Sequence, residues 1–128
     1  MSDALEGANR AAKLLSPGDG KPLSFVGVST VLKVVGEDTG GAWSLIESTV
    51  EPHFARFNLH RHRRMTEAIY ILEGALAVQL GEQTLTAVPG TLVFVPPGTW
   101  HTYANPGDRP VRYLLFMPPV SLGWMTTS

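Results

Sequence analysis

The sequence of 128 residues contains no cysteine. Disulfides, thiolate catalysis and cysteine-ligated zinc are therefore excluded, and any bound metal must be held by His, Asp, Glu or carbonyl oxygens. Charge is also scarce, since only 16% of the residues are charged and the formal net charge is −1. A nearly neutral chain gives no electrostatic reason to expect a nucleic acid or an anionic membrane as a partner.

Long apolar runs are missing as well. No run approaches the roughly 20 residues of a membrane span, and the first residues, MSDALEGANRAAKLL, lack an apolar core of signal-peptide length. We therefore expect a cytoplasmic protein that does not bind membranes. The length favours one domain, and 44% hydrophobic residues are enough for a compact core.

Short β-strands dominate the pattern of the chain. Spaced apolar residues predict a short helix within residues 3–15, which the Pro- and Gly-rich stretch 16–22 ends. Runs rich in β-branched residues, separated by Gly/Pro turns, then predict an all-β sandwich or barrel. The expected strands are 25–35, 43–51, 55–62, 69–81 with a bend at Gly74, 84–88, 91–95, 99–105 and 111–117. This predicts an arm with a short helix over 1–22, a single barrel over 23–119 and a tail over 120–128.

Histidine is rare, with four in the chain, yet His60 and His62 lie two residues apart. Alternate residues of a strand share a face about 6.5–7 Å apart, so these two imidazoles can bind one ion from one side. Glu67 follows a short turn and can return a carboxylate to the same point, and His101 comes from a distant strand. Taken alone, the fragment around His60 fits a solvated polar patch as well as a metal site.

Three imidazoles and one carboxylate suit a divalent transition metal, with Fe, Mn, Ni, Zn and Cu all possible. In an octahedral site, four protein ligands leave two positions open for substrate and dioxygen, or for substrate and water. The ligand set by itself does not choose among these ions.

The spacing of these residues resembles the two signature motifs of the cupin superfamily, in their usual order. The first motif reads His60-x-His62-x4-Glu67-x6-Gly74, and the second reads Gly90-x5-Pro96-x-Gly98-x2-His101-x3-Asn105. The position six residues before His60, often Gly in the family, is Phe54 here. All four ligand positions of the family are kept.

The resemblance implies a double-stranded antiparallel β-helix, or jelly-roll barrel, with one metal inside one end held by His60, His62, Glu67 and His101. In such a barrel the polar face of residues 55–62 would point into the interior rather than to solvent. Arg56 and Asn58 then become candidates for binding substrate. By the same parity Tyr103 becomes a candidate for binding substrate or for catalysis, and Glu67 a candidate base.

Other residues have simpler structural roles. Gly74, Gly90, Pro96 and Gly98 suit bends and turns. The three arginines nearest the histidines suit a solvated loop; they are Arg61, Arg63 and Arg64. The tail, VSLGWMTTS, is apolar for a terminus and suits contact with a neighbour. The resemblance to cupins, which are often dimers, adds to this, so we expect a homodimer.

Three functions remain open. The first is a non-haem metal dioxygenase acting on a small, partly apolar, enolisable or aromatic molecule. The second is a non-redox metal-dependent cyclase, isomerase or lyase of a biosynthetic pathway, and the third is a binding or sensor barrel without turnover. The complete ligand set favours an enzyme of oxidoreductase type, but neither the substrate nor the reaction follows from the residues.

Overall fold

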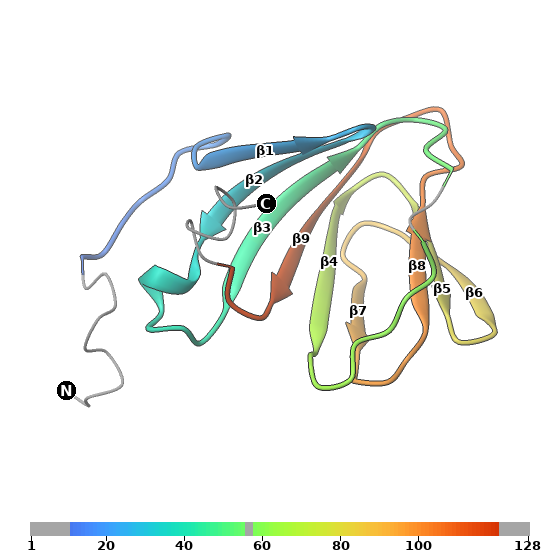
Figure 1. Ribbon diagram of the computed structural model, residues 1–128. Coiled ribbons are helices and arrows are strands. Elements are labelled where there is room, and N and C mark those ends of the chain that lie inside the picture. Colours follow the sequence, from blue (N-terminus) through green and yellow to red (C-terminus); the bar gives the residue numbers. More distant parts are fainter. Residues whose placement is uncertain (1–10, 56–57, 121–128) are drawn as a thin grey trace.

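The computed structural model describes residues 11–55 and 58–120 and shows an all-β fold of two antiparallel sheets (Figure 1). The larger sheet has the strand order β1-β2-β3-β9-β4-β7, and the smaller has the order β6-β5-β8. Strands far apart in sequence lie side by side, as β3 and β9 do, which is typical of a jelly roll. The strands are β1 (Lys21–Phe25), β2 (Val28–Val34), β3 (Ser44–Val50), β4 (Glu67–Glu73), β5 (Leu76–Leu80), β6 (Gln83–Ala87), β7 (Leu92–Val95), β8 (His101–Ala104) and β9 (Val111–Met117).

The predicted jelly roll is confirmed, whereas the predicted N-terminal helix is not seen. Residues 11–15 of the predicted helix 3–15 have no helical structure, and residues 3–10 lie outside the described part of the chain. In the described part of this segment Leu14 and Leu15 are exposed and do not belong to the core, and an isolated helix of this length is marginal in water. Lys21–Phe25 instead pairs with β2, so a strand begins within the arm expected over 1–22.

Two long predicted strands are each divided by a glycine. The run 25–35 turns at Gly27, which has a φ of +82°, and forms the hairpin of β1 and β2. The run 69–81 breaks at Gly74, with a φ of +79°, and its halves β4 and β5 belong to different sheets. A Cβ at Gly74 would lie 2.5 Å from the carbonyl oxygen of Pro110, so the chain reverses where only glycine fits.

The core lies between the sheets and consists mostly of β-branched and leucine side chains. Fully buried members include Val50, Ile69, Ile71, Leu76 and Val78. Asn105, directly after β8, is also buried, and its side-chain amide donates to the carbonyl oxygens of Val50, Glu51 and Arg109. This amide fixes the end of β8 against the larger sheet.

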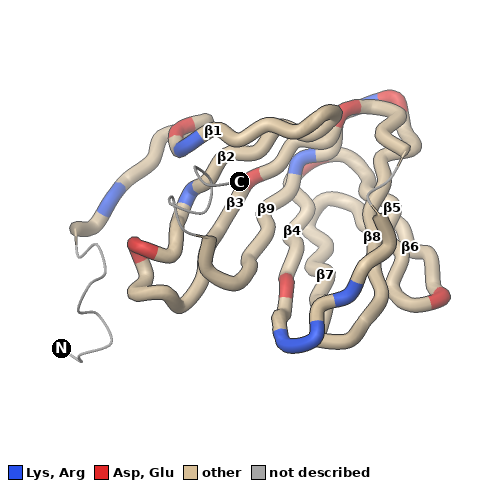
Figure 2. Tube along the Cα trace, in the orientation of Figure 1, with Lys and Arg blue, Asp and Glu red and all other residues tan. Residues whose placement is uncertain are grey.

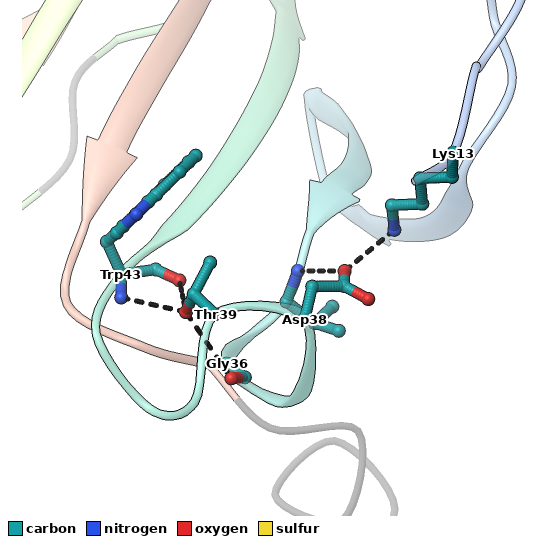
Figure 3. A network of polar contacts seen from close by, with 6 residues as sticks. Lys13, Gly36, Asp38, Thr39 and Trp43 are labelled. Atoms are coloured by element: carbon teal, nitrogen blue, oxygen red, sulfur yellow. Dashed lines mark hydrogen bonds and ion pairs between the residues drawn. The ribbon is translucent and has the colours of Figure 1, made fainter. Parts of the chain in front are cut away.

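The loop between β2 and β3 is closed by side-chain hydrogen bonds (Figure 3). The Thr39 hydroxyl accepts from the backbone N–H of Trp43 at 3.1 Å and donates to its carbonyl at 2.8 Å. Asp38 accepts from the backbone N–H of Val35 and forms an ion pair with Lys13 at 2.7 Å. The loop contains the 3₁₀ turn η2 (Gly36–Asp38) and holds the Trp43 ring 6.3 Å from that of Phe116.

Candidate metal centre

The four predicted ligands lie close together in space although they come from three separate segments of the chain. Glu67 is the first residue of β4 and His101 the first residue of β8. His60 and His62 lie on a segment beside β8, joined to it by two backbone hydrogen bonds between His60 and His101, at 2.8 and 3.1 Å. The predicted strand 55–62 is therefore wrong as a regular strand, since its described part has a single isolated bridge, at His60, and lacks a continuous ladder.

The ring nitrogens of two histidines are oriented by backbone carbonyls. The Nδ1 atom of His60 lies 2.7 Å from the carbonyl oxygen of Asn58, and the Nδ1 atom of His101 lies 2.8 Å from that of Thr99. A carbonyl only accepts, so in the neutral ring each Nδ1 carries the proton and each Nε2 keeps its lone pair. This arrangement prepares Nε2 to bind a metal, because outer hydrogen bonds fix the tautomer and direction of ligating rings.

The ligand atoms are close enough to share one ion. One such atom from each of His60, His62, Glu67 and His101 lies within 4.8 Å of the others. The Oε1 atom of Glu67 lies 2.9 Å from Nε2 of His62 and 3.9 Å from Nε2 of His101. Ligands about 2.0–2.2 Å from a common ion are separated by roughly 3–4 Å, so the donor set fits a transition metal ion.

The burial of His101 supports the same conclusion. Its side chain is almost completely buried, and its Nε2 atom has no hydrogen-bond partner in the described structure. A buried polar atom without a partner is costly, and a metal ion would satisfy it. The His62 side chain is 29% exposed and the Glu67 side chain 10% exposed, so the ligands pass from the interior to the surface.

A cavity of about 200 Å³ lies beside the candidate ligands, against the inner face of the larger sheet. His60 and Glu67 form one side of it, and Tyr103 and Tyr113 also line it. Burial, together with the charge of Glu67, raises the pKa of Tyr103 far above its ordinary value. Burial also raises the pKa of Tyr113 to about 12, against a hydrogen bond from Ser48 that lowers it.

The predicted substrate-binding residues lie in different places. Tyr103 lines the cavity, with its ring centroid 5.8 Å from that of His101. Asn58 is exposed, and its backbone carbonyl rather than its side chain contacts the site. Arg56 lies outside the described residues. Roles in substrate binding or catalysis for Arg56, Asn58, Tyr103 and Glu67 stay predictions.

The arginines near the histidines are exposed, as expected of a solvated loop. Figure 2 shows basic residues gathered in the turn before β4, close to the acidic residue that begins this strand. Arg61, Arg63 and Arg64 are all exposed, and the Arg61 guanidinium lies 4.8 Å from the centre of the Trp100 ring. These arginines therefore lie at the protein surface beside the candidate ligands.

Three hydroxyl residues of the cavity were missed by the sequence analysis, although a signal for them exists. Thr30, Ser48 and Tyr113 line the cavity from β2, β3 and β9. In β9, Tyr113 alternates with the outward-facing Arg112 and Leu114 and shares its inward face with buried Val111. Period-two alternation in each strand could have placed them inside, given the correct pairing of the strands.

A jelly roll with a candidate metal site is the class of protein that this fold and these residues define. The sequence matches the family model for the cupin domain over residues 46–117, and the chain belongs to the cupin superfamily. The match contains all four ligand positions. Within residues 11–55 and 58–120 we find no helix with the length and apolarity needed to cross a membrane.

Two curated proteins and one solved structure illustrate the similarity. The chain is 30% identical over 86 residues to mannose-1-phosphate guanylyltransferase RfbM of Salmonella typhimurium, covering 67% of this chain and 18% of that protein. It is 34% identical over 79 residues to an uncharacterised protein of Methanocaldococcus jannaschii, covering 61% of this chain and 62% of the other. The chain thus spans less than two thirds of either relative.

The solved structure is the polyketide cyclase RemF from Streptomyces resistomycificus. It superposes with a TM-score of 0.75 at 23% identity, covering 84% of this chain and 80% of the cyclase. This similarity shows the shared fold.

Proposed function

We propose that this cupin is a metal-dependent enzyme that transforms a small oxygen-bearing organic molecule without net oxidation, as an isomerase, cyclase or lyase. The observation that carries the proposal is the buried Nε2 atom of His101, without a hydrogen-bond partner and grouped with three further ligand atoms beside a cavity. His60, His62, Glu67 and His101 would hold one divalent transition ion. When bound, this ion supplies Lewis acidity to a substrate oxygen.

The chain's own residues bind and orient the substrate in this proposal. The cavity excludes bulk water from one side of the ligands, and the Tyr103 hydroxyl donates a hydrogen bond to a substrate oxygen. Glu67 is the only carboxylate among the described residues lining the cavity. In this role a carboxylate oxygen of Glu67 accepts the proton that leaves a carbon next to a carbonyl, and returns it at another position.

Hydrogen exchange tests this proposal without knowledge of the natural substrate. The zinc-loaded protein is incubated anaerobically in D2O with a panel of enolisable single-ring ketones, and loss of the α-hydrogen signals is followed by NMR. We expect faster exchange with wild type and the uncatalysed rate with Glu67→Gln at matched zinc content. Absence of enhancement in the wild-type protein with every ketone and every loaded metal would contradict the proposal.

A second candidate is the oxygenase that the sequence analysis favoured. Its support is the number of ligands, because four protein ligands around an octahedral ion leave two positions for substrate and dioxygen. Oxygen-electrode measurements with Fe(II)-, Mn(II)-, Ni(II)- and Cu(II)-loaded protein separate the two candidates. Substrate-dependent oxygen uptake that is lost in His60→Ala favours the oxygenase, whereas turnover with Zn(II) and no oxygen uptake favours the non-redox enzyme.

A barrel that binds a small molecule without turnover gives a third outcome. If the protein consumes a large molar excess of substrate, the non-catalytic barrel is excluded. Saturable binding without consumption of the ligand would support it.

A further inference from the structure

A row of three hydroxyl groups crosses the inner face of the larger sheet, at one level of three adjacent strands. Thr30 on β2 pairs in register with Ser48 on β3, and Ser48 pairs with Tyr113 on β9. The Thr30 and Ser48 hydroxyl oxygens lie 3.0 Å apart, and Ser48 hydrogen-bonds with Tyr113. All three residues are at most 4% exposed and line the cavity beside the metal ligands.

The hydrogen bonds among the three hydroxyls of this row leave one hydroxyl proton that can be donated to a bound molecule. Each hydroxyl has one proton to donate and two lone pairs to accept with. Three hydroxyls joined by two hydrogen bonds use two of the three protons. The third proton and several lone pairs are available to an oxygen or amide group in the cavity.

The cavity offers no cation to an acidic group at the hydroxyl row. Among the described residues, none of those that line it is Lys or Arg. Apart from His60, Glu67 and Tyr103, the hydroxyl row is surrounded by apolar side chains, those of Phe25, Val28, Ile46 and Leu115. A phosphate or carboxylate buried there would lose its hydration without gaining a charged partner, which is strongly unfavourable. An uncharged oxygen group loses less hydration free energy on burial, and it gains one or two hydrogen bonds from the hydroxyl row.

The volume limits the substrate further. A cavity of about 150 Å³ holds one benzene molecule. The volume here is about 200 Å³, which corresponds to one ring with a few substituents, and a fused multi-ring skeleton would extend beyond it.

From these observations we infer the substrate class: a compact, single-ring molecule with a metal-binding oxygen at one end and an uncharged hydroxyl, carbonyl or amide at the other. The hydroxyl row of Thr30, Ser48 and Tyr113 recognises the uncharged end, and it disfavours sugar phosphates and dicarboxylates. The inference rests on the proposed metal-dependent function, because the metal holds the first end.

Three benzohydroxamic acids test this assignment, because the hydroxamate group is a strong zinc ligand and leaves the para substituent to probe the row. The substituents are hydroxymethyl, ethyl, which has the same shape without the hydroxyl, and carboxylate. Binding to zinc-loaded protein is measured by isothermal titration calorimetry. We expect the hydroxymethyl probe to bind at least about tenfold more tightly than the carboxylate probe and several-fold more tightly than the ethyl probe.

The variants Tyr113→Phe and Thr30→Val each remove one hydroxyl with little change in shape. We expect the preference for hydroxymethyl over ethyl to fall to about one in Tyr113→Phe, and zinc content to stay unchanged. Tyr70→Phe is the matched control, since Tyr70 is an exposed tyrosine on β4 outside the cavity, and it should keep the wild-type preference. If Tyr113→Phe does not fold, Thr30→Val carries the test.

The zinc content and the probe preference report on different claims. One zinc per chain with equal binding of hydroxymethyl and carboxylate probes overturns the inferred substrate class and leaves the metal site intact. Wild-type preference in both Tyr113→Phe and Thr30→Val also overturns it. Absence of zinc binding overturns the proposed function itself.

Discussion

At the scale of single residues, two backbone carbonyls prepare the metal site. The carbonyls of Asn58 and Thr99 each accept from the Nδ1 of the histidine two residues later, so the same local contact orients His60 and His101. The contact depends on the path of the backbone rather than on the side chains at positions 58 and 99. Spacing in the sequence predicted the candidate ligands, but it did not reveal what orients their rings.

We predict that His101→Ala loses metal binding and keeps the fold, because apolar strands hold the sheets together. Wild-type protein should gain about 2.7 kcal/mol of stability when Zn(II) is added at 100 times its dissociation constant. Thermal melts with and without zinc should therefore differ for wild type and coincide for His101→Ala. Arg63→Ala, at an exposed position, serves as the control and should behave as wild type. A zinc-dependent shift that persists in His101→Ala would argue against this ligand.

The second residue-scale prediction concerns alkaline pH. The pKa of Tyr113 is about 12 in the folded protein and about 10 when unfolded. Because the folded state keeps a proton that the unfolded state loses, this contribution is complete below pH 10 and disappears as the pH rises to 12. Stability measured by urea unfolding should fall by up to roughly 2–3 kcal/mol over this interval through Tyr113.

Tyr113→Phe should make that fall smaller. Buried Tyr103, whose pKa is also raised, accounts for part of the remaining decrease. Equal slopes for wild type and Tyr113→Phe between pH 10 and 12 would show that Tyr113 titrates normally.

At the scale of elements, the sequence predicted the strands of the β3–β9 region well and the segment of the first motif poorly. Alternation and β-branched residues define β3 and β9, which pair with each other in a ladder of seven residue pairs. The stretch 55–62 shows the same alternation, yet in its described part only an isolated bridge joins it to β8. Its geometry depends on hydrogen bonds to residues about 40 positions away, such as the one from the Gly98 N–H to the His62 carbonyl, which a local pattern does not contain.

The break between β4 and β5 gives an element-scale prediction. Gly74 and Gly90 both have positive φ, of +79° and +88°, but an added Cβ meets the Pro110 carbonyl oxygen only at Gly74 and open space at Gly90. Gly74→Ala should therefore cost about 1–3 kcal/mol more than Gly90→Ala, which carries the backbone strain alone. Chemical denaturation of both variants measures the difference, and equal losses would mean that the chain relaxes around Gly74 without cost.

At the scale of the whole molecule, the outer face of the larger sheet bears an apolar patch of Trp43, Tyr70, Leu92, Phe94 and Phe116, all at least 40% exposed. Strand pairing places Phe116 and Phe94 on either side of Ala68, and Leu92 opposite Tyr70. Five half-exposed side chains of this size present on the order of 400–500 Å², about half of what each partner buries in a standard interface. Edge strand β7 lies within the patch and offers unpaired backbone groups in addition.

We propose that a second copy of the chain covers this patch, which gives a location to the homodimer expected from the sequence. A twofold axis brings the same apolar side chains together, with no requirement for charge complementarity. Light scattering coupled to size exclusion should report a dimer for wild type and a monomer for Phe94→Asp. Leu85→Asp, at an exposed leucine of β6 on the smaller sheet, is the control and should remain dimeric. A monomeric wild-type protein, or a dimeric Phe94→Asp, would contradict the proposal.

The central claim is that His60, His62, Glu67 and His101 bind one metal ion, and elemental analysis tests it most directly. Wild-type protein and His101→Ala are purified without added metal or chelator, and the transition metals are quantified per chain. We predict about one ion per wild-type chain, restored by titration where it is substoichiometric, and less than a tenth of that in His101→Ala. Wild-type protein that contains no metal and takes up none of Fe(II), Mn(II), Ni(II), Cu(II) or Zn(II) would contradict the account.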